Sequence, residues 1–362
     1  MLEVHSVSAE DLRQVQSGLV GRTPLEQAEP WEGFAAVMGS PLRFRLLISE
    51  DGKPLAFVSL YSHELRGAKF LWARRGPVWL KQPPPEREES ALLAIKRYVT
   101  AEDPEIVFIR LHSWYVHPFL RTPIRVLGYD RTALINGARG NRQAALDAMP
   151  SAGRKLVRRS QTLFGEAGGV IAEETGLTQE EFHEYYKLLE ETALRDCFTP
   201  HEENYYWQLL VQLGPEHARL FGARIDGDLV CWDLVIAYRK NVGAFFGASS
   251  DSSRQTKATV LLDFEVACML AEEGMCDLDL MGVHSPMVPS LYSVGRYKLQ
   301  FVQNYTNVPG LWEFPLRPNI YGTLCGALKV RATWRSVSSR LRLLLDRQGG
   351  PTAPESLTLG EK

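Results

Sequence analysis

Residues 43–61 have the sequence RFRLLISEDGKPLAFVSLY, and this stretch decides the fold. Two strand-like apolar runs lie on either side of Asp51-Gly52. The same pattern returns at residues 218–238, ARLFGARIDGDLVCWDLVIAY, on either side of Asp226-Gly227. An Asp-Gly pair between two such runs is the strongest short-range signal for a β-hairpin. We therefore expect two hairpins of the same design.

Each hairpin is followed by the same series of elements, a third strand, a helix and a fourth strand. They lie at Lys69–Ala73, Glu86–Thr100 and Glu105–Leu111 after the first hairpin, and at Val242–Ala248, Lys257–Glu273 and Cys276–Met281 after the second. A repeated β-β-β-α-β unit of this length predicts two similar domains of mixed α/β (α+β) class. We expect the domains to face each other across a cleft, because substrates commonly bind between such domains.

The composition indicates an ordinary globular protein. Its 362 residues are 45% hydrophobic and carry a formal net charge of −2, which argues against bulk electrostatic binding of nucleic acid but permits a local basic groove. The five cysteines have neither CxxC nor metal-ligand spacing, which indicates a reducing cytoplasm and predicts no metal site. No apolar run approaches the roughly 18–20 residues that span a bilayer. We expect a cytoplasmic protein with at most peripheral contact at the inner face of the membrane.

The sequence has no Ser-His-Asp signature, HExxH, Walker loop or GxGxxG. The duplicated unit resembles acyltransferase domains of the GNAT type. However, the glycine-rich loop that holds the pyrophosphate of coenzyme A, Q/R-x-x-G-x-G/A, is missing at both helix starts. The second start is SSDSSRQTK, residues 249–257, where hydroxyls either cap the helix or leave amides free for an anion. We therefore expect that acetyl-coenzyme A is not used.

Several short motifs occur in an informative order. They are Pro24-Leu25-Glu26-Gln27 with Trp31 and Phe34, Arg75-Gly76-Pro77-Val78, RKLVRRS at 154–160, Glu191-Thr192-Ala193 with Arg195, GASS at 247–250, GMCDLDLMG at 274–282, and Tyr297-Lys298 with Phe301. Over residues 24–320 this series resembles the Fem (FemABX) family, whose members use aminoacyl-tRNA to build the cross-bridge of bacterial peptidoglycan. The resemblance implies two GNAT-like acyltransferase domains facing each other across a cleft.

The resemblance also implies the domain limits. Residues 1–140 form the first GNAT-like domain, which is completed by residues 307–347, and residues 141–306 form the second. Residues 348–362 are expected to be a disordered tail. No heptads are sustained between the domains, so the coiled-coil insertion of some members is absent. One apolar stripe on a C-terminal helix is expected to pack against the first domain, and it consists of Val330, Trp334, Val337, Leu341 and Leu344.

The function implied by the resemblance is tRNA-dependent transfer of an amino acid to the amine of a peptidoglycan precursor stem peptide. Aminoacyl-tRNA is then a co-substrate, the acceptor is a UDP-linked or lipid-linked precursor, and no cofactor or metal is implied. We expect a monomer. Two alternatives stay open. One is a GNAT-superfamily acyltransferase that forms an amide on another small amine, such as an antibiotic-pathway peptide, and the other is a non-catalytic precursor-binding relative.

The sequence departs from the family pattern at two positions. Ala35 stands where members that bind a UDP-linked precursor often have a lysine, four residues after the tryptophan. His112 stands where an acidic residue often follows the last strand of the first domain. Both departures concern the acceptor more than the type of reaction.

Lys298 and Asp279 are the predicted catalytic residues. Transfer of an aminoacyl group to an amine needs an unprotonated nucleophile and stabilisation of the developing oxyanion. The ammonium of Lys298 is expected to hold the oxyanion or the donor carbonyl, and the alternative is a solvated surface lysine. Asp279 alternates with Leu278 and Leu280 on a strand. It either pairs with a basic partner inside the second domain or acts on the nucleophilic amine.

The residues predicted to bind substrate are Tyr297, Arg254, Arg154, Arg158, Trp31 and His112. The arginines suit phosphates of the acceptor or of the tRNA acceptor end, although solvated arginines on a helix surface give the same pattern. His112 and His284 each follow the last strand of a repeat, which puts them near the cleft. A hydrogen-bonded loop histidine is the alternative for each. Trp31 and Phe34 are better explained by packing than by ligand contact.

Overall fold

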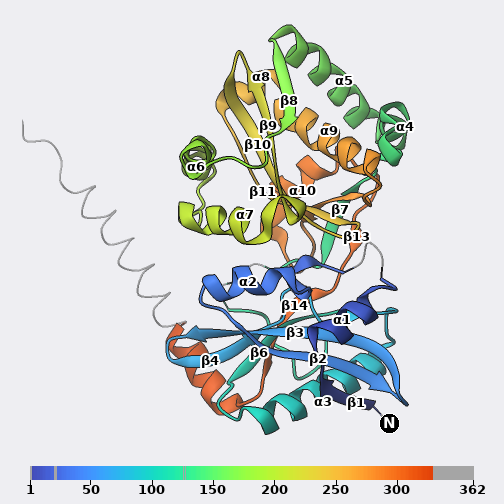
Figure 1. The fold of residues 1–362 in the computed structure, drawn as a ribbon, viewed down its shortest axis with the longest axis vertical. Helices are drawn as coiled ribbons and strands as arrows, with labels where there is room; N and C mark the ends of the chain where they lie inside the picture. The colour runs from blue at the N-terminus through green and yellow to red at the C-terminus, as the bar shows by residue number, and fades with distance from the viewer. Residues whose placement is uncertain (1, 20–22, 125, 127, 329–362) are drawn as a thin grey trace, which may run out of the picture. The chain divides into compact units, whose positions relative to one another are not determined.

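The computed structural model describes residues 2–19, 23–124, 126 and 128–328, and it contains two seven-stranded sheets (Figure 1). The first sheet contains β1 (Leu2–Ser6), β2 (Leu42–Glu50), β3 (Lys53–Leu65), β4 (Ala68–Trp72), β5 (Val78–Trp79), β6 (Phe108–Ser113) and β14 (Gly310–Pro315). The second contains β7 (Arg131–Ile135), β8 (Gly169–Glu173), β9 (Ala218–Ile225), β10 (Asp228–Tyr238), β11 (Asn241–Ser249), β12 (Leu278–Gly282) and β13 (Thr306–Asn307).

Ten α-helices and three short 3-10 helices connect these strands within the described ranges, and residues 318–328 after the last strand are helical as well. The α-helices are α1 (Ala9–Gln16), α2 (Pro30–Val37), α3 (Pro85–Glu102), α4 (Arg142–Ala148), α5 (Ser151–Glu166), α6 (Gln179–Asp196), α7 (Glu203–His217), α8 (Asp251–Thr256), α9 (Ala258–Glu272) and α10 (Tyr292–Lys298). The 3-10 helices are η1 (Leu25–Gln27), η2 (Ala138–Gly140) and η3 (Pro289–Leu291).

Both predicted hairpins are present. Asp51 and Gly52 join β2 to β3 with φ angles of 49° and 74°, and Asp226 and Gly227 join β9 to β10 with φ angles of 52° and 93°. Positive φ at both central residues is what a two-residue type I′ turn requires, and Asp-Gly supplies it at little steric cost. The local sequence therefore sets the register of each hairpin.

The two repeats continue in the same way. In the first, β4 is followed by α3 and then by β6, which pairs parallel to β4. In the second, β11 is followed by α8 and α9 and then by β12, which pairs parallel to β11. The predicted mixed α/β fold with two repeated units is thus confirmed. The helix predicted from Lys257 differs in detail, because the separate short helix α8 precedes α9.

Each sheet also receives a strand from a distant part of the chain. β14 pairs antiparallel with β6 in the first sheet, and β7 pairs antiparallel with β12 in the second. The chain therefore passes from the first sheet to the second between β6 and β7, and it returns between β13 and β14. The exact domain limits near residue 140 and residue 306 stay a prediction.

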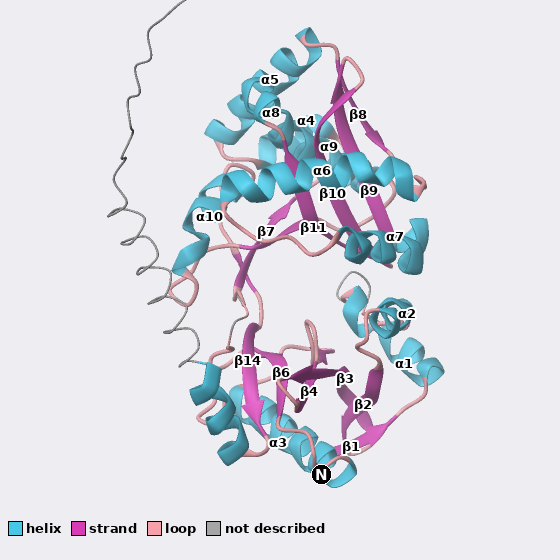
Figure 2. Cartoon of the chain, turned by 90° about the vertical axis from the view of Figure 1, so that its left-hand side faces the viewer, coloured by secondary structure: helices cyan, strands magenta, loops and turns pink. Residues whose placement is uncertain are grey.

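Helices cover both faces of the second sheet (Figure 2). Side chains alternate along a strand, and in β10 the residues Cys231 and Val235 belong to the core shared with α5 and α9. Trp232 and Leu234 belong to the core shared with α6 and α7. Asp233 lies between them in the strand, so its side chain is directed toward the α9 face. β10 is buried throughout almost its whole length.

Residues 1–316 belong to one compact unit, and a second begins at Arg317, where residues 318–328 are helical. The predicted apolar stripe from Val330 to Leu344 and the predicted tail lie outside the described residues. In the described ranges, the helices are all too short or too polar to cross a membrane. The same ranges contain no cluster of His, Cys, Asp and Glu side chains suited to a metal ion.

Candidate active site

The strands β11 and β12 separate next to a cavity. They pair in parallel where Gly243 lies opposite Asp279, and no further pair between them occurs in the described chain. A cavity of about 350 Å³ adjoins the separated strands. We call it the Lys298 cavity, and the residues that define it are 244–249 of β11, Leu280 of β12, Asp233 of β10, Asp263 of α9, and Tyr297 and Lys298 of α10.

Lys298 is anchored to the end of β12. Its Nζ donates hydrogen bonds to the carbonyl oxygens of Gly282, at 2.8 Å, and Met281, at 3.3 Å. Burial lowers the pKa of this ammonium to about 8, although Asp263 and Asp279 nearby favour its charged form. An ammonium has three N–H donors. The third donor of Lys298 remains for a group bound in the cavity.

Two buried aspartates lie beside Lys298, and the sequence analysis did not identify them. Asp263 accepts a hydrogen bond from the Tyr297 hydroxyl at 2.5 Å. Asp233 and Asp263 interact with each other, and both are more than nine-tenths buried. Burial raises the pKa of Asp263 to about 6 and raises that of Asp233 well above its usual range. Tyr297 is therefore held at the cavity by Asp263.

Asp279 is fully engaged by neighbouring donors. It accepts hydrogen bonds from Arg75 at 2.8 Å, from the backbone N–H of Met281 at 2.7 Å, and from the Thr132 hydroxyl. One of the two roles expected for Asp279 from the sequence was pairing with a basic partner inside the second domain. This expectation was wrong, because Arg75 follows β4 of the first repeat. With its oxygens held in this way, Asp279 is arranged to position Arg75.

Arg75 and Asp279 both line a second cavity of about 420 Å³. We call it the Arg75 cavity, and its principal residues are Arg75, Trp79, His112, Trp114, Tyr129 and Asp279. Asp279 and Leu280 are consecutive in β12, so one strand borders both cavities. The aromatic rings and the cation suit a ligand that has both flat apolar parts and anionic parts.

His112 lies in the wall of the Arg75 cavity, although the structure places it within β6 and not after that strand, where the sequence analysis had expected it. Its Nδ1 lies 3.1 Å from the carbonyl oxygen of Pro309. A carbonyl oxygen only accepts, so Nδ1 carries the proton and Nε2 is an acceptor. Burial, together with the charges of Arg75 and Arg74, lowers the pKa of His112 to about 4, although the hydrogen bond to Pro309 acts in the opposite direction. His112 is thus a neutral acceptor at neutral pH and not an acid.

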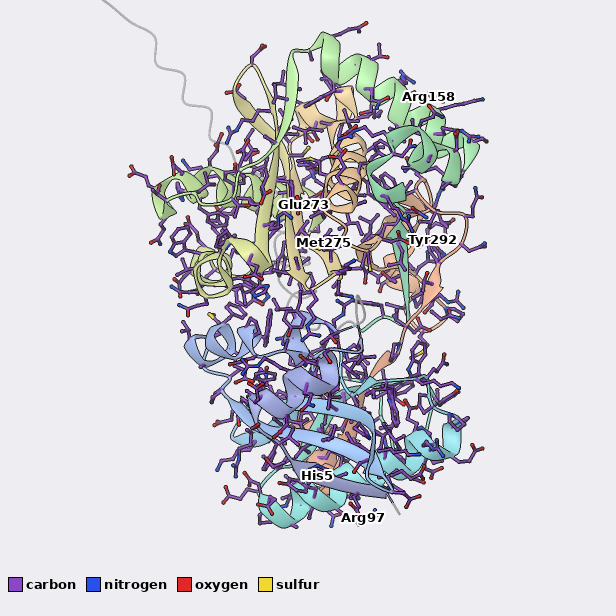
Figure 3. The ribbon with its side chains drawn as sticks, turned by 45° about the vertical axis from the view of Figure 1, so that its right-hand side comes forward. His5, Arg97, Arg158, Glu273, Met275 and Tyr292 are labelled. Carbon is purple, nitrogen blue, oxygen red and sulfur yellow. The ribbon has the colours of Figure 1, made fainter. Side chains whose placement is uncertain are left out.

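The remaining predicted arginines do not line either cavity. Arg154 lies on α5 beside Asp147, at 3.5 Å. Arg158 also lies on α5, and Figure 3 shows its side chain on the outer side of that helix. Arg254 lies on α8 with a side chain that is 60% exposed, 3.9 Å from Asp196. Asp196 borders the Lys298 cavity, so Arg254 lies next to a residue of the cavity wall.

Trp31 is part of the core. Its side chain is buried on α2, and its ring meets that of Phe34 edge to face at 4.9 Å. Phe34 in turn contacts the ring of Tyr205 on α7 at 5.4 Å. The packing interpretation therefore describes the position of Trp31, which connects α2 to the helices of the second sheet.

Residues 249–257, the turn before α9, make hydrogen bonds within the turn and with α5. Ser250 caps α8, since its hydroxyl accepts a hydrogen bond from the N–H of Ser253 at 3.2 Å. Ser160 of α5 donates to the carbonyl oxygen of Lys257 at 2.7 Å, so α5 packs against this turn. Residues 249–257 contain no glycine. The amide of Ser253 and the carbonyl oxygen of Lys257 are thus already hydrogen-bonded within the protein.

The comparisons with known proteins agree with this architecture. Residues 151–298 match the acetyltransferase (GNAT) domain family. The crystal structure of FemX is similar over 89% of this chain and 99% of its own, with a TM-score of 0.68 and 13% sequence identity. The fold is Fem-like. It is thus the fold of a GNAT acyltransferase, with two such domains in one chain.

Two other solved structures have lower similarity. A conserved protein of unknown function from Bacteroides thetaiotaomicron matches with a TM-score of 0.50 and 10% identity, over 86% of this chain and 99% of its own. A tandem GNAT protein from the clavulanic acid biosynthesis pathway matches with a TM-score of 0.49 and 13% identity, over 87% and 99%. A search of curated proteins found no match to the sequence.

Sequence reasoning named Lys298 and Asp279, whose catalytic roles stay a prediction, but it named neither Asp233 nor Asp263 and did not foresee the ion pair of Arg75. A signal for the aspartates was present. Asp233 lies in the apolar interior of β10, and Asp263 lies between two apolar residues on the buried side of α9. Acidic side chains are almost never fully buried unless they have a partner. Two such aspartates in neighbouring core elements therefore indicate a functional pair.

Proposed function

We propose that this protein is a tRNA-dependent aminoacyltransferase that moves an amino acid from aminoacyl-tRNA to the amine of a peptidoglycan precursor stem peptide. The observation that carries the proposal is Lys298, a cation with a free N–H, at the cavity where β11 and β12 separate. The Fem-like fold supports the class of reaction. No bound cofactor takes part in this proposal.

The reaction makes one bond and breaks one bond. The neutral amine of the acceptor attacks the ester carbonyl carbon, and a C–N bond forms as the carbonyl oxygen becomes an oxyanion. The ester C–O bond then breaks, and the 3′-oxygen of the terminal ribose leaves with the proton that the amine loses. In this proposal Lys298 stabilises the oxyanion with its third N–H, and stabilisation of this kind lowers the barrier of many acyl transfers more than any other single effect.

The two cavities give the two substrates separate places. In the proposal the aminoacyl ester occupies the Lys298 cavity, and part of the acceptor occupies the Arg75 cavity. Arg75 suits an anionic group of the acceptor, and Asp279 fixes the orientation of its guanidinium. Since β12 borders both cavities, the acceptor amine reaches the ester at the end of this strand. His112 offers an acceptor nitrogen there and no charge.

Coenzyme A is not the donor in this proposal. A pyrophosphate needs several free backbone amides close together at a helix start. Here the amide of Ser253 already donates a hydrogen bond to the Ser250 hydroxyl, and α5 packs against the turn at Lys257. Side chains at every position of residues 249–257 would also hinder close approach of a phosphate to the backbone.

The experiment is incubation of the full chain with a mixture of charged tRNAs and, separately, a UDP-linked and a lipid-linked precursor. The product mass identifies the amino acid, the number added and the acceptor. Gain of an amino acid by either precursor supports the proposal. Acyl transfer only to another small amine favours the alternative within the GNAT superfamily. Binding of a precursor without any transfer favours a non-catalytic relative, and either result contradicts the proposal.

A further inference from the structure

One carboxylate oxygen at the Lys298 cavity is buried without a partner. Asp233 is 7% exposed, and its Oδ2 has no hydrogen-bond partner among the described residues. A buried carboxylate oxygen without a donor is costly, on the order of 1–3 kcal/mol or more. Asp233 lines the cavity, so a bound group that donates hydrogen bonds would remove this cost.

The groups around Asp233 define what it would bind. Asp263 on α9 lies against it, and Tyr297 on α10 already donates its hydroxyl proton to Asp263. Lys298 on the same helix donates to the end of β12. On β11, a Cβ at Gly247 would lie 2.7 Å from Asp233 Oδ1, so glycine leaves this side of the carboxylate open.

Burial and the neighbouring Asp263 raise the pKa of Asp233 well above its usual range, so Asp233 on its own keeps its proton, and both aspartates can ionise only when a further cation is bound. Lys298 compensates one carboxylate, and the second has no cation of its own within the described part of the cavity. A primary ammonium fits the place, because it brings one positive charge and three donors. A neutral acyl chain would leave Oδ2 of Asp233 unpaired, and an anionic one would add repulsion.

We propose that Asp233, together with Asp263, binds the primary ammonium of the transferred acyl group, so that the donor is selected as an α-aminoacyl group. This inference rests on the proposed function and names the recognition element of its donor site. Asp233 and Asp263 are positioning residues here, since they hold the group next to the reacting carbon.

The geometry of an amino acid connects this recognition to catalysis. The α-nitrogen lies two covalent bonds from the carbonyl carbon, a span of about 2.5 Å. An ammonium held by the aspartate pair therefore fixes the ester carbonyl within a short distance of the neighbouring Lys298. The pair also keeps the donor amine protonated, so that only the amine of the acceptor is nucleophilic.

Binding of two matched donor mimics tests the inference. The probes are 3′-(L-alanylamino)-3′-deoxyadenosine and its L-lactyl counterpart, which replaces the ammonium by a hydroxyl of similar size. Calorimetry on the full chain should find the alanyl probe bound about 100-fold more tightly, and Asp233→Asn should reduce this preference to about threefold or less. The lactyl probe should bind wild type and Asp233→Asn about equally, because it makes no ion pair.

Asp228→Asn is the matched control, since Asp228 is an exposed aspartate on the same strand, and it should keep the full preference. Asp263→Asn is the second variant. It should also weaken binding of the alanyl probe while leaving binding of the lactyl probe unchanged. Equal binding of both probes by wild type, or an unchanged preference in Asp233→Asn with an unchanged melting temperature, would overturn the inference.

A transfer assay separates failure of this inference from failure of the proposed function. Wild type is given tRNA charged with the amino acid that it transfers, or the same tRNA charged with the matching α-hydroxy acid. Preference for the aminoacyl donor supports the inference. Equal transfer of both acyl groups leaves the proposed function intact and removes the role of Asp233. Transfer of neither contradicts both.

Discussion

Arg75 and Asp279 form an ion pair that joins the two repeats. Nη2 of Arg75 lies 2.8 Å from Oδ2 of Asp279, although the residues are 204 positions apart in the chain. Their side chains are only 20% and 12% exposed. One comes from the turn after β4 and the other from β12, so the pair connects the first sheet to the strand that borders both cavities.

Removing one partner of this pair should destabilise the protein. Arg75→Met leaves the Asp279 carboxylate with only Thr132 and the Met281 N–H, and we expect a loss of about 3 kcal/mol in the free energy of unfolding. Urea unfolding measures this loss. The double variant Arg75→Met/Asp279→Leu should recover most of it, because no unpaired charge remains.

The exposed ion pair of Lys69 with Glu105 provides the control. Lys69→Met should leave the unfolding midpoint unchanged, since solvent screens an exposed pair. The free energies of unfolding are also measured for Arg75→Met and Asp279→Leu alone. If the loss in the double variant equals the sum of the two single losses, the ion pair does not couple the repeats.

Lys298→Met should reduce turnover roughly 100-fold or more, equivalent to about 2.7 kcal/mol of activation free energy. The substitution keeps an apolar side chain of similar length and removes the charge, so the melting temperature should change little. Turnover is measured by single-turnover transfer from charged tRNA. Lys187→Met, at an exposed lysine on α6, should behave as wild type. A Lys298→Met protein with normal turnover would mean that the cavity lacks its proposed catalytic cation.

The pH profile should report the lowered pKa of Lys298. Its pKa is about 8, so the stabilising ammonium, and with it turnover, should decline as the pH rises through about 8. Lys298→Arg keeps its charge at higher pH and should move this decline upward. Turnover of wild type that still increases between pH 8 and pH 9.5 would contradict the assignment of the ammonium as the active form.

The same pKa makes an independent prediction for stability. The ordinary pKa of a lysine is 10.5, so between about 8 and 10.5 the unfolded chain binds more protons at this residue than the folded chain does. The contribution of Lys298 therefore makes the free energy of unfolding rise with pH across that window. Thermal unfolding of wild type and Lys298→Met over this range measures it, and the rise should be smaller in the variant.

The arginines of α5 should act on tRNA binding and not on the chemical step. Arg154→Ala and Arg158→Ala should each raise the KM for charged tRNA roughly threefold at low salt, with less effect at high salt, as phosphate contacts do. Turnover at saturating tRNA should stay the same, because neither residue lines a cavity. Arg97→Ala is the control. Arg97 is an exposed arginine on α3, at the end of the molecule opposite Arg158 (Figure 3). A salt-independent effect on turnover would contradict this assignment.

The sequence predicted those parts of the fold that short segments determine. The Asp51-Gly52 and Asp226-Gly227 turns need only two residues with positive φ, so each hairpin was found from its own residues. The pairing of β14 with β6 was harder to predict from short segments. It requires the chain to return to the first sheet after it has formed the second. The short helix α8 was missed because its serines are equally compatible with a capping loop.

Only part of the site could be predicted from the sequence, because the rest depends on contacts between distant segments. Lys298 was named because Tyr297-Lys298 and Phe301 resemble a motif of the Fem family and follow a loop at the end of a repeat. The aspartate pair depends on how α9 packs on β10, and no spacing in the sequence brings position 233 to position 263. The partner of Asp279 was predicted in the wrong repeat, because only the tertiary structure brings Arg75 to β12.

The most direct test of the account is a choice of donor. The full chain is given one precursor carrying a free amine, with either charged tRNA or acetyl-coenzyme A, and the mass of the product is measured. The account predicts a product heavier by an amino acid residue with charged tRNA, and no product with acetyl-coenzyme A. An acetylated product, with none from charged tRNA, would contradict it.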